Sequence, residues 1–153
     1  MSLIVLEQFA APKGVLLPGG LESIVRVLEP VQDDLAFSVF AFDGVLKEAP
    51  RRPYEELRSL VSDSERGLQL SWDELVRLAE DTDDIWDLLL VGYSRQQRPP
   101  VRGAFEELAP ASEVIVEVFD SGSLRIALQS EALAERASAE FPALQPSPRK
   151  SGN

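Results

Sequence analysis

The sequence predicts an α+β fold, in which about four helices pack on a mixed or largely antiparallel sheet of about five strands. Three observations lead to this prediction. Segments with helical periodicity are interspersed with short apolar segments that read as strands. One of these, residues 35–42, is apolar on both faces, and two others flank a short Asp-Ser-Gly-Ser turn. We expect a single domain over residues 1–141 and a disordered polar tail over residues 142–153.

The first elements are a strand and an amphipathic helix. Residues 3–9 form an apolar run that predicts the first strand, and the glycine- and proline-containing residues 12–20 predict a loop. Apolar residues then recur at i, i+3, i+4 and i+7 from Leu21 to Leu28, which is the pattern of one helix face. Pro30 is expected to end that helix.

The central part of the chain is expected to hold the core of the sheet. Because residues 35–42 are apolar on both faces, they predict a central strand covered on both sides, and the following Asp-Gly pair predicts a turn. A helix is expected over residues 53–62 and a short extended link over residues 67–70. Ser71 and Glu74 have the spacing of a capping box, which predicts that another helix begins there.

The last third contains one ambiguous segment and one clear hairpin. Residues 85–93 read as a strand apolar on both faces or as a helix beginning at Asp83 or Asp84, and the strand is favoured. A polar, proline-containing loop is expected over residues 94–103. Residues 114–119 and 124–128 predict a β-hairpin, and residues 130–141 predict a final helix.

The composition excludes several classes of chemistry. The chain has no histidine and no cysteine, so catalytic triads, thiolate nucleophiles and histidine or cysteine metal sites are absent. We therefore assign no catalytic residue, expect no cofactor and no metal, and lean towards a protein that is not an enzyme. The first residues do not resemble a secretory signal, and the arginine-rich, lysine-poor composition is typical of GC-rich bacterial genomes, so we expect a bacterial, cytoplasmic protein.

The negative charge is concentrated in one stretch. The net charge is −11, which argues against binding nucleic acids or anionic membranes, and residues 54–87 contain eleven acidic but only three basic residues. We expect this stretch to present an acidic surface to a basic protein partner. The candidate surface residues are Glu55, Glu56, Asp73, Glu80, Asp81, Asp83, Asp84 and Asp87. The candidate aromatic anchors beside them, which also fit core positions, are Tyr54, Trp72, Trp86 and Tyr93.

Four of these acids would share one face if a single helix ran through them. Glu80, Asp83, Asp84 and Asp87 have the spacing i, i+3, i+4, i+7, and carboxylate clusters suit Mg²⁺ or Ca²⁺. The glycine and the final glutamate of a calcium-binding loop are missing, however. A solvated turn, with one aspartate capping the next element, is the favoured interpretation.

Residues 40–46, with the sequence FAFDGVL, resemble the first motif of haloacid-dehalogenase-type phosphatases. In that family a buried strand ends in a nucleophilic aspartate, followed two residues later by an acid–base aspartate. The resemblance aligns Asp43 with the second aspartate, but Ala41 stands at the nucleophile position and cannot form an aspartyl-phosphate. We therefore expect no phosphatase activity, and a strand that ends in a turn.

Three functions remain open from the sequence. The first is a non-enzymatic interaction domain, similar in composition to inhibitors and immunity-type proteins that neutralise basic enzymes. The second is an enzyme that uses carboxylates, with Mg²⁺ as a candidate cofactor, around Glu80 to Asp87 together with Asp43. The third is a structural subunit whose acidity serves solubility. Oligomeric state and partner identity are not predicted.

Overall fold

A computed structural model describes residues 3–9, 20–120 and 122–147 of the chain. All neighbouring strands of its single seven-stranded sheet are antiparallel, and their order is β3-β2-β4-β5-β6-β1-β7. The strands are β1 (Ile4–Phe9), β2 (Leu35–Leu46), β3 (Leu68–Leu70), β4 (Thr82–Ser94), β5 (Val114–Phe119), β6 (Ser123–Leu128) and β7 (Gln145–Pro146). The helices are α1 (Leu21–Leu28), α2 (Tyr54–Ser62), α3 (Trp72–Asp81), α4 (Phe105–Leu108) and α5 (Glu131–Glu140), with 3₁₀ turns η1 (Glu29–Val31) and η2 (Ala109–Ala111).

The predicted α+β class and the antiparallel sheet are confirmed, but the sheet is larger than expected. The described residues form seven strands and five α-helices, in place of about five and about four. The additional strands are β3, which we expected only as an extended link, and β7, which lies in the expected tail. The additional helix is α4, a single turn too short to leave a periodic pattern in the sequence.

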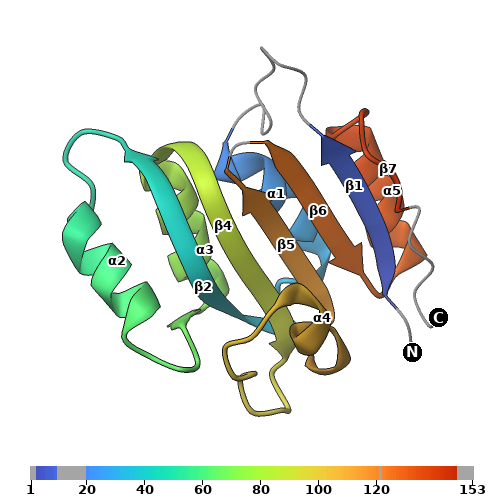
Figure 1. Cartoon of the computed structure of the whole chain (residues 1–153), viewed down its shortest axis with the longest axis horizontal. Helices are drawn as coiled ribbons and strands as arrows, with labels where there is room; N and C mark the ends of the chain where they lie inside the picture. Colours follow the sequence, from blue (N-terminus) through green and yellow to red (C-terminus); the bar gives the residue numbers. More distant parts are fainter. Residues whose placement is uncertain (1–2, 10–19, 121, 148–153) are drawn as a thin grey trace.

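The main core lies between one face of the sheet and three helices. Helices α1, α3 and α5 cover this face, and α2 lies beside β2 (Figure 1). Ile24, Leu75 and Ala137 of the three helices are almost fully buried against sheet residues such as Leu90 and Val116. Burying a large aliphatic side chain of this kind stabilises the fold by about 1.5–3 kcal/mol.

A second, smaller core covers only half of the opposite face. Phe105 and Leu108 of α4 pack there against Val91, Tyr93 and Ile115 of β4 and β5. These strand residues lie towards the end of β4 and the start of β5. Within the described residues, no helix lies over the other half of this face, which contains the start of β4 and the ends of β1, β2 and β5 (Figure 1).

The turn expected at Asp43 and Gly44 does not exist, and that prediction is wrong. Strand β2 continues to Leu46 because β4 pairs with it along this whole length. The register shifts between Asp43 and Gly44, where β4 inserts the extra residue Trp86. Local turn propensity is outweighed here by the backbone hydrogen bonds and the packing of a long strand pair.

The start of strand β4 also separates the carboxylates that were expected to share one helix face. The favoured strand over residues 85–93 is confirmed, but it begins at Thr82, immediately after α3. Among the four acids with helical spacing, only Glu80 lies on the helix. Asp83, Asp84 and Asp87 lie on the strand, so the interpretation of one shared helical face is wrong.

The expected tail begins as part of the fold. Leu144 is buried in the main core, and Pro146 pairs with Leu6 where β7 lies against β1. Disorder is therefore wrong for this part of the segment, because an apolar residue and a strand partner hold it. Residues 148–153, and the predicted loop over residues 12–19, lie outside the described residues. None of the described helices is long and apolar enough to cross a membrane.

Candidate functional site

The uncovered half of the sheet exposes large apolar side chains. Phe9 at the end of β1 is 77% exposed and Phe119 at the end of β5 is 67% exposed. Both residues lie opposite Ser123 of β6, one on each side, so they occupy the same level of the sheet. The neighbouring Val118 and Leu124 point into the main core, and side chains alternate along a strand, so the two phenylalanines point to the opposite face.

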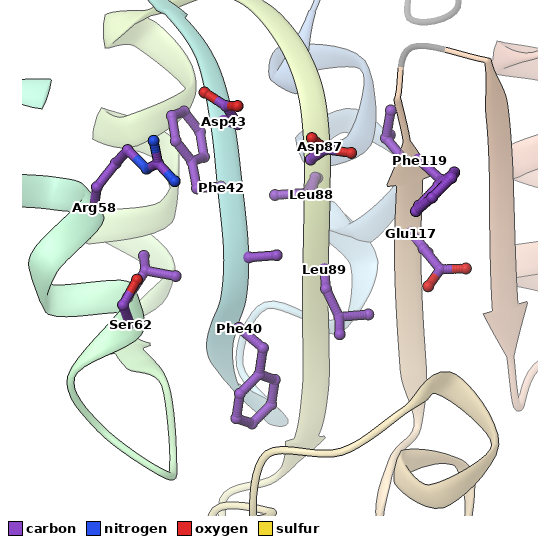
Figure 2. Close-up of a pocket in the computed structure, with 13 residues that line it drawn as sticks. Phe40, Phe42, Asp43, Arg58, Ser62, Asp87, Leu88, Leu89, Glu117 and Phe119 are labelled. Carbon is purple, nitrogen blue, oxygen red and sulfur yellow. The ribbon is translucent and has the colours of Figure 1, made fainter.

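Acidic side chains lie on the same half of this face. Asp43 of β2 is directly opposite Asp87 of β4, and Glu117 lies on β5, the next strand (Figure 2). The bulge makes Trp86 and Asp87 both turn away from the main core, since Ile85 and Leu88 on either side are buried in it. Trp86 is 43% exposed. We call this surface the open face and define it by Phe9, Asp43, Trp86, Asp87, Glu117 and Phe119.

Two adjacent hollows shape the open face. The first, of about 430 Å³, crosses β2, β4 and β5, with Phe40 and Leu89 among its apolar lining and Arg58 of α2 at its side (Figure 2). The second, of about 470 Å³, crosses β1, β6 and β5 and includes Phe9. Glu117 and Phe119 line both hollows, which makes the open face one continuous surface.

The carboxylates of the open face are held in place by hydrogen bonds. Asp87 Oδ1 accepts a hydrogen bond from the backbone N–H of Asp120 at 2.7 Å. Glu117 Oε1 is 2.8 Å from Nη2 of Arg125. Asp43 accepts a hydrogen bond from the Tyr54 hydroxyl of α2. Neither Asp43 nor Asp87 forms an ion pair with any other residue that the structure describes.

Tyr54 links α2 to the open face. Its hydroxyl accepts a weak hydrogen bond from the backbone N–H of Gly44 at 3.4 Å and donates to Asp43. Burial and the hydrogen bond to the Asp43 carboxylate together raise the pKa of Tyr54. The tyrosine is therefore a neutral donor at physiological pH, and it orients the Asp43 carboxylate at the edge of the hollow.

The remaining acids of the predicted surface are spread over several elements. Glu55 and Glu56 are exposed in the first turn of α2. Asp73 is exposed in the first turn of α3, whereas Glu80 and Asp81 lie at its other end. Two helical turns therefore separate Asp73 from these two residues.

Several of these acids have partners within the chain. Glu80 and Asp81 both pair with Arg51, at 3.2 and 3.3 Å. Asp84 accepts a hydrogen bond from the Trp86 indole at 3.1 Å, and Asp83 is exposed beside it. Among the eight predicted acids, Asp87 is the one that lines a hollow of the open face.

The candidate aromatic anchors have different environments. Trp72 packs on Phe37 with ring centroids 6.0 Å apart, and Tyr93 is buried in the second core. Tyr54 is half-buried against Asp43, and Trp86 is exposed. Trp86 is therefore the aromatic side chain of this set that a partner on the open face can reach most readily.

Sequence reasoning missed three residues of the open face, Phe9, Glu117 and Phe119. A signal for two of them was present in the alternation of β5, where Val114, Val116 and Val118 form one face. Glu117 and Phe119 therefore had to lie on the other face. No feature of the sequence distinguishes an exposed phenylalanine next to a hairpin turn from a buried one. The exposure of these side chains was therefore not predictable.

The chemistry available on the open face is that of carboxylates and aromatic rings. No group of three or more potential ligand residues, counting Asp, Glu, His and Cys, is arranged to hold a metal ion in the described part of the chain. Ala41 lines the first hollow two residues before Asp43 and offers no nucleophilic atom. Compared with known proteins, the chain matches no family model, no curated sequence and no solved structure.

Proposed function

We propose that this chain is a protein-interaction domain that binds a basic segment of a partner protein on the open face. The observation that carries the proposal is the placement of exposed Phe9, Phe119 and Trp86 on the same half of the sheet as Asp87 and Asp43. Exposed apolar side chains gathered on one surface are typical of interaction sites. The carboxylates beside them give that surface a preference for positive charge.

The combination suits lysine or arginine side chains in particular. A guanidinium group can stack on a phenylalanine or tryptophan ring while it pairs with a neighbouring carboxylate. The net charge of −11 would attract a basic partner from a distance, and the exposed Glu55, Glu56, Asp83 and Asp84 contribute to that field. The acidic stretch over residues 54–87 thus steers the partner, and the open face holds it.

This mode of action fits an inhibitor or immunity-type protein in a bacterial cytoplasm. Such a protein needs a stable surface that covers basic residues of its target and needs no catalytic group of its own. The same negative field disfavours nucleic acids and anionic membranes, whose phosphates it would repel.

A charge-matched pair of variants tests where a basic segment binds. We expect Asp43→Asn/Asp87→Asn to weaken binding of a fluorescein-labelled peptide of alternating arginine and alanine by about fivefold or more. Glu55→Gln/Glu56→Gln removes the same number of charges from α2 and should weaken binding by less than about twofold. Fluorescence anisotropy at physiological ionic strength measures both affinities.

Comparing the two double variants distinguishes peptide binding at the open face from attraction by the overall negative charge of the protein. Equal losses in the two double variants would mean that the peptide senses only net charge, and the open face would lose its assigned role. Phe119→Ser provides a test without a change of charge, and it should also weaken binding. If sedimentation shows instead that the protein dimerises and that Phe119→Ser abolishes the dimer, the open face binds a second copy and the proposal is wrong.

A carboxylate-based enzyme is the second candidate, because Asp43 and Asp87 line the same hollow from directly opposed positions. Mg²⁺ is the metal that such a pair would favour. We expect calorimetric titration with MgCl₂ to show no saturable binding, since Asp43 and Asp87 have no third ligand in the described residues. Saturable binding that Asp43→Asn abolishes would favour the enzyme.

A further inference from the structure

A separate pocket lies among α2, α3, β3 and the end of β2. Its volume is about 170 Å³, and it shares no lining residue with the hollows of the open face. Five leucines form most of its wall, and three of them are only partly buried, so their apolar surface is accessible from the pocket. The five are Leu46, Leu57, Leu68, Leu70 and Leu78.

The two carboxylates that line this pocket already have partners. Glu74 accepts a hydrogen bond from the backbone N–H of Ser71 at 3.1 Å, as part of the capping box of α3. Asp81 accepts from the backbone N–H of Arg51 at 3.0 Å and lies 3.3 Å from Nη1 of the same arginine. Arg51 also pairs with Glu80. Both lining carboxylates are therefore already held by contacts within the chain.

Two further arginines of the pocket have no contacts of this kind. Arg52 and Arg77 both line it, and within the described residues neither side chain forms an ion pair or a hydrogen bond. Arg51 donates a hydrogen bond to the backbone carbonyl of Arg77 at 3.1 Å, which holds the segment containing Arg52 against α3.

We propose that this pocket binds a small amphipathic carboxylate, with its apolar tail among the leucines and its carboxylate on Arg52 and Arg77. A pocket of about 170 Å³ is smaller than the roughly 300 Å³ at which sites for drug-sized ligands begin, so it suits a short apolar tail such as that of hexanoate. Arginine suits the head group because its N–H groups match the two oxygens of a carboxylate.

Titration of the full chain with sodium hexanoate tests the proposal. Methyl resonances of Leu46, Leu68 and Leu78 should shift and saturate with a dissociation constant of about 1 mM, as expected for so small a ligand. Acetate lacks the tail and hexanol lacks the charge, so each should bind about tenfold more weakly or not at all. The leucine methyl spectrum reports the site directly and needs no knowledge of the function.

Arginine variants show whether the charge matters. Arg77→Gln should weaken hexanoate binding by about fivefold or more, and Arg52→Gln provides the same test if the first variant does not fold. Arg98→Gln is the matched control, because Arg98 is exposed on the loop after β4 and lies outside the pocket. Its affinity for hexanoate should equal that of the unchanged chain.

Three results would overturn the assignment. They are the absence of saturable methyl shifts, hexanol binding as tightly as hexanoate, and equal affinity of the Arg77→Gln, Arg52→Gln and Arg98→Gln variants. The proposal is independent of the open face. Asp43→Asn/Asp87→Asn should bind hexanoate normally, since neither residue lines this pocket.

Discussion

Replacing Phe37 by alanine is expected to lower the free energy of unfolding by about 3–5 kcal/mol. Phe37 has no exposed surface, lies on central strand β2 and packs against Trp72 in the main core. Phe40 on the same strand belongs to the second core, is 3% exposed and lies under the guanidinium group of Arg102. Phe40→Ala should therefore cost a similar amount, and the pair of variants tests both faces of the strand. Urea denaturation followed by circular dichroism gives both values.

Phe119→Ala is the matched control for these two variants. It removes the same atoms from a side chain that is 67% exposed, so the free energy of unfolding should change by less than about 0.5 kcal/mol. Losses below about 1 kcal/mol for both Phe37→Ala and Phe40→Ala would show that β2 is not a buried central strand.

The second large effect is expected at Gly44, where the backbone of β4 lies very close to β2. A Cβ atom at this position would lie 3.1 Å from the backbone carbon of Asp84 and 3.1 Å from Cα of Ile85, and closer still to the Asp84 carbonyl oxygen. Backbone atoms in a paired strand cannot move aside as a side-chain tip can. Gly44→Ala should therefore lower the free energy of unfolding by about 1–3 kcal/mol or more, measured by the same denaturation.

Gly122→Ala is the control for this close approach. A Cβ atom there would meet its nearest neighbours at 3.7 Å, an ordinary contact, so we expect a change of less than about 0.5 kcal/mol. If the two glycine variants were equally stable, the strands would not be as close at Gly44 as described, and the bulge beside Asp43 would lose its support.

Sequence analysis located well those elements whose position is determined by residues within the same segment of the chain. The capping box of Ser71 and Glu74 marks the start of α3 because both hydrogen bonds form within one turn of chain. The hairpin of β5 and β6 and the helix α1 likewise follow from alternation or periodicity inside one segment. These signals need no knowledge of distant residues.

The errors came from pairing between distant segments. Asp43 and Gly44 have the composition of a turn, but eleven residues of β4 pair with β2, and this pairing continues the strand past them. Sequence reasoning grouped Asp87 with the acids of its own segment and named Asp43 beside them only in the enzyme hypothesis. Strand register brings Asp87 opposite Asp43, and sheet order adds Glu117 from a third strand. The candidate site thus depends on register and strand order, which a single sequence does not reveal.

The position of the candidate surface was not predictable from charge. Charge density along the chain identifies the segment richest in acidic residues, but it does not determine which of those residues meet in space. The contacts of Arg102 were likewise not predictable from the sequence. This residue lies in a loop that reads as solvated, but its guanidinium donates hydrogen bonds to the backbone carbonyls of Phe40, Val61 and Ser64 and so fastens the loop to β2 and α2.

These contacts of Arg102 also decide how the sheet can associate with other chains. Only three residues of β2 pair with β3, and beyond them Arg102 occupies the carbonyl of Phe40 while Tyr54 occupies the N–H of Gly44. At the other edge β7 is two residues long and ends in a proline, which has no N–H to donate. Within the described residues, neither β2 beyond β3 nor β7 therefore offers an incoming strand a long row of free backbone groups. These two features limit edge-to-edge association of the described strands, and they favour recognition through side chains over extension of the sheet by another strand.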